Sequence, residues 1–245
     1  MNCLLCQEFL AQQSSALSLL TGRQAGSDLV CSRCLSQFTP ITRVICYDCG
    51  RDSLPNEETI DKMSDNETKP GQQLCHDCQR WQAMGQSSLR HQALYRYDEQ
   101  MKEYMSRYKF IGDYRLHLVF QKEMRQAIRR LIKQERIDWV VPIPLTQSRL
   151  AKRGFNQVEP FLSGKVLAGL VTKEQQKVEQ SSLDRKKRME GEQPFKLAAG
   201  VGPNIVNRTI LLVDDIYTTG RTLHYAASCL YQAGAAQVFS ISLAR

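Results

Sequence analysis

The spacing of apolar residues after residue 90 alternates between short apolar runs and longer amphipathic stretches. Apolar side chains at intervals of three and four residues predict helices, whereas short apolar runs bounded by breakers predict buried strands. The expected elements are, in chain order, a strand at 91–98, helices at 101–110 and 114–136, a strand at 138–144, a helix at 155–170, a strand at 209–213, a helix at 220–233 and a strand at 238–243. Strands that alternate with helices form a parallel sheet covered on both faces, so the expected fold class is α/β.

Two loops of this region lie where ligands are expected, because open parallel sheets bind ligands beyond the carboxyl ends of their strands. The expected strands at 138–144 and 209–213 lead into the loops 142–157 and 214–222, which should therefore meet at one edge. Residues 172–193 are polar, highly charged and without periodicity, which predicts a long flexible loop over the site.

The first 80 residues are dominated by cysteines instead. Eight of the nine cysteines form four Cys-x-x-Cys pairs, which are Cys3/Cys6, Cys31/Cys34, Cys46/Cys49 and Cys75/Cys78. Two such pairs supply four thiolates to one tetrahedral Zn²⁺, so we expect two structural zinc sites rather than disulfides or a redox motif. Intervals of 24, 11 and 25 residues between the pairs favour two zinc ribbons built from neighbouring pairs. An interleaved pairing, first with third and second with fourth, stays open.

The change from a cysteine-rich sequence to one with helix and strand periodicity predicts two domains, a zinc-ribbon module over 1–85 and an α/β domain over 90–245. The module contains an acidic stretch at 52–73, which predicts a mobile loop. His76 is expected to be exposed on its knuckle, with a role as substitute ligand as the alternative. Cys229 is expected in the core of the last helix.

Composition narrows the class of protein further. A hydrophobic fraction of 42% in 245 residues suffices for a real core. The chain has no run of about 18 apolar residues, and its N-terminus lacks the pattern of a secretory signal, so we expect a cytoplasmic protein without a membrane span. The formal net charge of +8 suits phosphate-rich ligands or nucleic acid, although the basic residues of 122–136 are also typical of a solvated helix face.

The stretch 210–222 reads Ile-Leu-Leu-Val-Asp-Asp-Ile-Tyr-Thr-Thr-Gly-Arg-Thr. A buried strand, a polar turn and a helix N-terminus together form an anion site, because free N–H groups and the helix dipole point at the turn. The candidate residues are Asp214 and Asp215 for ribose hydroxyls, and Thr218, Thr219, Gly220, Arg221 and Thr222 for a phosphate. The stretch resembles the phosphoribosyl-pyrophosphate (PRPP) motif of type I phosphoribosyltransferases. The alternative is an ordinary strand and turn with an acidic edge.

A second constellation follows the strand at 138–144 and is basic. Its candidate residues are Arg149, Lys152, Arg153, Gly154, Asn156 and Gln157. Cationic side chains facing the Thr-Thr-Gly turn across the sheet edge would neutralise a pyrophosphate, and a glycine permits close backbone approach. Asn156 and Gln157 can hydrogen-bond a base or a phosphate, whereas the alternative for Asn156 is a helix N-cap.

Together with the cysteine knuckles and the stretch Tyr-Lys-Phe-x-Gly-Asp at 108–113, these motifs resemble the ComF (ComFC/GntX-type) family over essentially the whole chain. The resemblance implies a type I phosphoribosyltransferase-like domain that binds PRPP, with Lys109 as a further binding residue. It also implies a role in DNA uptake during natural competence, with the helicase ComFA and single-stranded DNA as partners. One departure is Gly191, where family members often have Asn after the equivalents of Gln180, Leu183 and Arg188.

Catalysis at such a site would proceed by attack at the ribose C1 with loss of pyrophosphate. Mg²⁺ would accompany PRPP, and Asp214 and Asp215 would fix the ribose and assist the developing positive charge. Two non-catalytic alternatives stay open. One is a single-stranded DNA-binding adaptor whose bases stack on some of four aromatic residues, which are Tyr104, Tyr108, Phe110 and Tyr114. The other is a sugar-phosphate sensor that acts through the zinc module.

Overall fold

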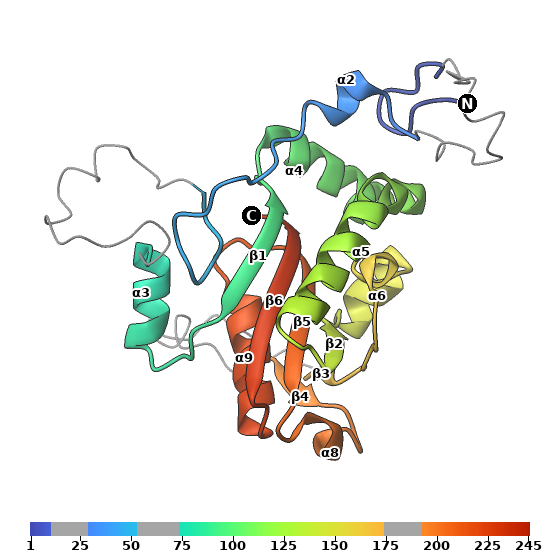
Figure 1. The fold of residues 1–245 in the computed structure, drawn as a ribbon. Coiled ribbons are helices and arrows are strands. Elements are labelled where there is room, and N and C mark those ends of the chain that lie inside the picture. Colours follow the sequence, from blue (N-terminus) through green and yellow to red (C-terminus); the bar gives the residue numbers. More distant parts are fainter. Residues whose placement is uncertain (11–28, 53–73, 174–192) are drawn as a thin grey trace, which may run out of the picture.

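The computed structural model describes residues 1–10, 29–52, 74–173 and 193–245 (Figure 1). Four parallel strands form its central sheet, in the order β1-β6-β5-β2. The strands are β1 (Arg90–Tyr95), β6 (Gln237–Ala244), β5 (Thr209–Ile216) and β2 (Trp139–Pro142). The expected α/β fold with a parallel sheet is confirmed.

Helices cover the sheet on both faces, as the alternation of strands and helices along the chain predicted. The helical segments of one face are α4 (Glu99–Ser106), the π-helical turn η2 (Arg107–Ile111), the 3₁₀ turn η3 (Tyr114–Leu116) and α5 (His117–Gln134). The helix of the other face is α9 (Arg221–Gln232). Successive side chains of β5 point to opposite faces of the sheet, so that Leu211 packs in the core under α5 and Leu212 packs in the core under α9.

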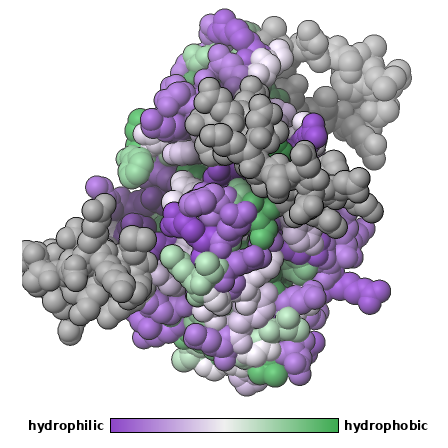
Figure 2. Space-filling model, turned by 90° about the vertical axis from the view of Figure 1, so that its left-hand side faces the viewer, coloured by the Kyte–Doolittle hydropathy of each residue, from purple (hydrophilic) through white to green (hydrophobic). Residues whose placement is uncertain are grey.

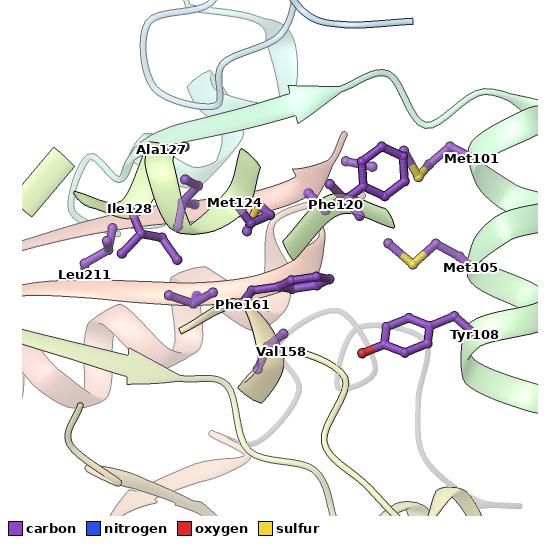
Figure 3. Close-up of a cluster of buried hydrophobic side chains, with 14 of the residues drawn as sticks. Met101, Met105, Tyr108, Phe120, Met124, Ala127, Ile128, Val158, Phe161 and Leu211 are labelled. Carbon is purple, nitrogen blue, oxygen red and sulfur yellow. The ribbon is translucent and has the colours of Figure 1, made fainter. Parts of the chain in front are cut away.

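The core under α5 is built from methionine and aromatic side chains of several elements (Figure 3). Met105 and Tyr108 project from α4 and η2 toward Phe120 of α5 and toward Phe161. All four of these side chains are fully buried. This packing fixes η2 against the sheet, close to the carboxyl end of β5.

The structure corrects the expected helix over 155–170. Within that range only a 3₁₀ turn forms, η4 (Glu159–Phe161), and the helix lies earlier, as α6 (Gln147–Arg153). The Thr146 hydroxyl caps α6 by accepting a hydrogen bond from the Arg149 N–H, and Gly154 ends the helix with a φ of +82°. The apolar spacing after Gly154 therefore does not mark a helix. Val158 and Phe161 are apolar because they reach the core from an irregular segment.

Three small elements were not predicted. They are the antiparallel pair β3 (Leu170–Thr172) and β4 (Phe195–Leu197), and the helix α8 (Gly202–Ile205). Apart from its first and last few residues, the flexible loop expected at 172–193 lies outside the described residues, and so do Gln180, Leu183, Arg188 and Gly191.

In the described residues of the cysteine-rich part the helices are α2 (Ser32–Leu35) and α3 (His76–Ala83). His76 is exposed on α3, as expected, and Cys229 is buried in α9. Beyond Asp52 the acidic stretch 52–73 lies outside the described residues. The face of the molecule that carries α3 is mostly hydrophilic, with apolar residues in separate spots (Figure 2). No helix of the described ranges is long and apolar enough to cross a membrane.

Candidate functional site

The acid pair lies inside β5 and not in the turn after it, because the strand continues to Ile216. Neighbouring residues of a strand point to opposite faces, so the two carboxylates separate. Asp215 forms an ion pair with Lys109, with 2.8 Å between Nζ and Oδ2. The Oδ1 atom of Asp214 accepts a hydrogen bond of 2.8 Å from the backbone N–H of Asp215. Both acids are buried at the carboxyl edge of the sheet.

Asp214 has an unusual pKa. Burial, followed by the nearby charge of Asp215, raises it to about 7, and the backbone hydrogen bond acts in the opposite direction. A carboxyl group of this kind gains or loses a proton near neutral pH. Strongly shifted groups in a hollow are typical of functional sites.

Lys109 reaches the acid pair from η2. Its side chain is mostly buried, whereas the next residue, Phe110, is 75% exposed. π-helical turns are rare and frequent at functional sites, and this one turns Lys109 inward while Gly112 ends it with a φ of +78°. The structure therefore brings a predicted binding residue from the first helical region next to the predicted acids.

The Thr-Thr-Gly loop (217–220) connects β5 to α9. A hollow at the amino end of α9 is lined by Asp214 and by the residues from Ile216 to Leu223. Thr218, Thr219 and Thr222 are exposed there, so their hydroxyls are accessible to a ligand. Arg221 is exposed as well, with its guanidinium over the Tyr225 ring.

Gly220 is required by the shape of this loop. Its φ is +76°, and a Cβ at this position would lie 2.2 Å from the Tyr217 hydroxyl oxygen. Only glycine combines that left-handed backbone with so close an approach. The hollow thus lies at the start of α9, where the first N–H groups of a helix have no partner within it, and such helix N-termini bind phosphate.

The basic residues expected in a loop lie on α6 and at its end. Arg149 and Lys152 are exposed, and Arg153 is half-buried. Burial lowers the pKa of Arg153, and the charge of Asp215 acts against that shift. Arg153 thus lies within electrostatic reach of Asp215, whereas Arg149 and Lys152 face solvent.

Asn156 and Gln157 are buried and bonded to the chain itself. The amide of Asn156 donates to the Ile143 carbonyl at 3.1 Å, and its Oδ1 accepts from the Val158 N–H at 3.2 Å. The nearest helical turn, η4, has Val158 and not Asn156 at its N-cap, so the N-cap alternative is wrong. The side chain of Gln157 accepts from Arg153, and its carbonyl accepts from the Tyr108 hydroxyl. Both residues shape the site from inside the fold.

The eight paired cysteines form two groups, and within each group all four sulfur atoms lie within 4.8 Å of one another. The first cysteine cluster contains Cys3, Cys6, Cys31 and Cys34, and the second cysteine cluster contains Cys46, Cys49, Cys75 and Cys78. Neighbouring pairs therefore combine, as the intervals favoured, and the interleaved pairing is wrong.

The sulfur positions fit a tetrahedral metal site. Separations of 3.6 Å join Cys46 to Cys78 and Cys49 to Cys75, and 3.9 Å joins Cys6 to Cys31. A tetrahedron with zinc–sulfur bonds of 2.3 Å has edges of about 3.8 Å. Disulfides would need about 2 Å.

Sequence reasoning missed three residues that contact the Thr-Thr-Gly loop or belong to it. Trp81 of α3 donates from its indole nitrogen to the Thr219 carbonyl at 3.0 Å. Arg245, just after β6, places its guanidinium 4.6 Å from the ring centre of Tyr217. Tyr217 lies inside the phosphoribosyl-pyrophosphate motif, so the motif could have pointed to it. Trp81 and Arg245 contact the loop from distant parts of the chain, and no local signal points to them.

A parallel sheet with an acid pair, a Thr-Thr-Gly loop and a helix N-terminus at one strand end defines a phosphoribosyltransferase-like protein, here joined to two Cys₄ clusters. Comparison with known proteins agrees. A family model described as the phosphoribosyl transferase domain matches residues 120–245.

Two relatives are similar over the whole chain. Competence protein ComFC of Streptococcus pneumoniae (strain ATCC BAA-255 / R6) is 35% identical over all of both chains. Competence protein ComFC of Bacillus subtilis (strain 168) is 31% identical over 99% of this chain and 94% of its own. The chain belongs to the ComFC family of competence proteins. A solved structure, described as the allosteric regulatory enzyme of purine biosynthesis, has a TM-score of 0.31 and 19% identity over 48% of this chain and 25% of its own, which is too distant to carry an argument.

Proposed function

We propose that this protein binds PRPP at the carboxyl edge of β5 and acts in natural competence. The supporting observation is the convergence of three predicted groups on one edge, namely the buried acids, the exposed Thr-Thr-Gly loop and Arg153. The phosphoribosyl transferase domain match and the two ComFC relatives support the class of ligand and the biological role.

Each part of PRPP has a matching group on the chain. The 5′-phosphate binds the N–H groups and hydroxyls of residues 218–222, because that segment joins a helix N-terminus to three threonines. Asp214 and Asp215 accept hydrogen bonds from the ribose hydroxyls. Arg153, with Arg149 and Lys152 beside it, neutralises the pyrophosphate. Lys109 offsets the charge of Asp215 and keeps that carboxylate in place.

Mg²⁺ fits this ligand, because carboxylate and phosphate oxygens are its preferred partners, and when bound it neutralises pyrophosphate charge. The proposed transfer breaks the bond between C1 and the pyrophosphate oxygen and forms a bond from C1 to the acceptor. The pyrophosphate takes the electron pair, and the acceptor loses its proton. Asp214 and Asp215 stabilise the positive charge that develops on the ribose, because they are fixed in advance at its hydroxyl edge. The acceptor is not identified.

The family assignment extends the proposal to partners. The relatives' names support a role in competence. On the strength of the family resemblance, we propose work on incoming single-stranded DNA beside a ComFA-type helicase, in the cytoplasm.

The test is calorimetric titration of the zinc-loaded protein with PRPP, with and without Mg²⁺. Wild type is expected to bind in a saturable, Mg²⁺-dependent manner, and Asp215→Asn to lose that binding. Asp138→Asn is the matched control, because Asp138 pairs with the Thr209 N–H at the opposite end of β5. Folded wild type that fails to bind PRPP would overturn the proposal.

The second candidate function is a single-stranded DNA-binding adaptor. The observation in its favour is a pair of exposed aromatic residues near basic ones, since Phe110 is 75% and Tyr114 47% exposed. Tyr104 and Tyr108 are buried and cannot stack bases. Binding should weaken steeply with salt and with Phe110→Ala. DNA binding that is absent or insensitive to salt would exclude this function.

A further inference from the structure

Two side chains join the second cysteine cluster to the Thr-Thr-Gly loop. The first is Trp81, three residues after the ligand Cys78 and therefore near it on α3. Its indole lies 4.5 Å from the His224 ring of α9 at an interplanar angle of 19°, so the two rings stack. The same indole donates a hydrogen bond of 3.0 Å to the Thr219 carbonyl. Trp81 therefore contacts both the loop and the helix that the loop begins.

The second side chain is Arg245. Its guanidinium donates to the Cys49 carbonyl at 2.6 Å and to the Cys49 sulfur at 2.5 Å. The same group lies 4.6 Å from the ring centre of Tyr217. The Tyr217 backbone N–H donates to the Ala244 carbonyl at 2.9 Å, which ties the start of the loop to the end of β6. Cys49 and Tyr217 thus share one guanidinium.

Tyr217 and Thr219 flank Thr218, and all three lie directly before Gly220, whose position already depends on the Tyr217 hydroxyl. A shift of either contact would change the direction of the N–H groups at the start of α9. Among the described residues, the first cysteine cluster connects to the α/β domain elsewhere, through Arg107, which donates to the carbonyls of Leu4 and Leu5.

We propose that Trp81 and Arg245 are positioning residues through which a metal in the second cysteine cluster sets the shape of the Thr-Thr-Gly loop. The proposal rests on the proposed PRPP site, since it explains how that site is organised. A Cys₄ metal site fixes the relative positions of its ligands, here Cys49 and Cys78, and groups outside the ligand set keep that geometry. Loss of the metal frees both ligands, and the two contacts to the loop move with them.

Metal and PRPP should therefore bind cooperatively, and the coupling must be reciprocal. In equilibrium competition with a chelator, PRPP is expected to tighten the binding of one zinc of the two by about fivefold or more, because coupling between sites typically changes affinity by about 5–150-fold. The other zinc should keep an unchanged affinity. The double variant Cys46→Ser/Cys49→Ser should lose that response to PRPP, and Cys3→Ser/Cys6→Ser should retain it. This pair of results would assign the coupled metal to the second cluster.

The positioning role is tested in the zinc-loaded full chain with Trp81→Ala, Trp81→Phe and Arg245→Met. Zinc content and circular dichroism check the fold, while hydrogen exchange of the 217–222 amides and PRPP titration report on the loop. Trp81→Ala is expected to keep its zinc, to lose protection in the loop and to weaken PRPP binding about tenfold or more. Trp81→Phe retains the ring but not the N–H donor, so an intermediate loss of about threefold is expected. Gln82→Ala, an exposed neighbour on α3, is the matched control.

An unchanged loop exchange rate in folded Trp81→Ala and Arg245→Met would overturn the proposal. If Trp81→Ala loses its fold, the conservative Trp81→Phe decides the question. A wild type that does not bind PRPP would remove the proposed function. Loop exchange in folded Arg245→Met would still test the link, because the amides report on the loop without any ligand.

Discussion

The two cysteine clusters have the same ligands and nearly the same internal spacing, yet they occupy different environments. All four cysteines of the second cluster are buried and pack with α9 in one hydrophobic core. In the first cluster, Cys6 and Cys31 are half-exposed, and the N-terminal segment lies beyond α4 at one end of the molecule (Figure 1). Two clusters with the same set of cysteine pairs thus lie in different surroundings, which predicts different roles for them.

Two residues near the clusters, Phe38 and Gly50, show where the cysteine-rich part packs on the α/β domain. Phe38 follows the first cluster by four residues and is buried under α5, with its ring 4.9 Å from that of Phe120. Gly50, which directly follows Cys49 of the second cluster, approaches the backbone of β1 so closely that a Cβ would lie 2.7 Å from the His91 carbonyl oxygen. Phe38 and Gly50 thus anchor the chain to the α/β domain, whereas the first cluster contacts that domain through Leu4 and Leu5.

The largest expected effect separates the clusters directly. Cys46→Ser/Cys49→Ser should lower the free energy of unfolding by at least about 4 kcal/mol, because structural zinc binding contributes about 10–16 kcal/mol to folding in small zinc domains. Cys3→Ser/Cys6→Ser should leave unfolding of the α/β domain nearly unchanged. Urea denaturation followed by circular dichroism measures both. Equal losses in the two variants would break the comparison.

Phe38→Ala tests the anchor. A buried phenylalanine truncated to alanine costs about 3–5 kcal/mol of unfolding free energy, because burial is lost and a cavity remains. Phe9→Ala is the control, since Phe9 belongs to the first-cluster region and is 76% exposed, and it should change stability by less than about 0.5 kcal/mol. Similar midpoints for the two variants in urea would mean that Phe38 is not an anchor.

The dependence of stability on pH should distinguish the contribution of Asp214 from that of the two cysteine clusters. Asp214 has a folded pKa of about 7 against an ordinary value of 3.8, so the folded state binds the extra proton in that window and stability falls as pH rises through it. The cost reaches roughly 2–4 kcal/mol above pH 7, because each pKa unit corresponds to about 1.4 kcal/mol. Metal sites respond in the opposite direction, since thiolates protonate in acid.

Asp214→Asn isolates the carboxyl contribution. In the absence of PRPP, the variant should be more stable than wild type at pH 8 and should approach it near pH 5. Urea unfolding across pH 5–8 gives the difference at each pH. A difference that does not change with pH would show that Asp214 is already charged throughout the range.

The smallest expected effect compares two glycines with nearly the same backbone. Gly50 and Gly112 have φ values of +67° and +78°, but a Cβ at Gly112 has open space. Alanine should cost about 1–2 kcal/mol at Gly112 from the left-handed backbone alone, and more at Gly50, where it meets the carbonyl of β1. Thermal melting of the two variants ranks them. A costlier Gly112→Ala would contradict close packing of the second cluster on the sheet.

The sequence predicts the structure correctly in regions where one local pattern, such as hydrophobic periodicity or cysteine spacing, determines it. The periodicity around β5, α9 and β6 and the spacing of the cysteine pairs each led to the observed arrangement. The acids were placed after the strand and not within it, because nothing local indicates that Lys109 compensates a carboxylate buried in β5. The boundary between 85 and 90 stays a prediction.

The rest depended on tertiary packing. The apolar residues of 155–170 satisfied a helical pattern, yet Gly154 and the core contacts of Phe161 favour an irregular path. Trp81 and Arg245 contact partners 138 and 196 residues away in sequence, at Thr219 and Cys49. No local pattern encodes such pairs, which is why the link between cluster and loop emerged only from the structure.

The central claim is that a phosphoribosyl ligand binds at the end of β5. It is tested most directly by amide NMR of the zinc-loaded protein during titration with PRPP and Mg²⁺. The account predicts saturable shifts at Thr218–Thr222 and near Lys109, with inorganic phosphate affecting only the first group. Shifts confined to other surfaces, or none at saturating PRPP, would contradict it.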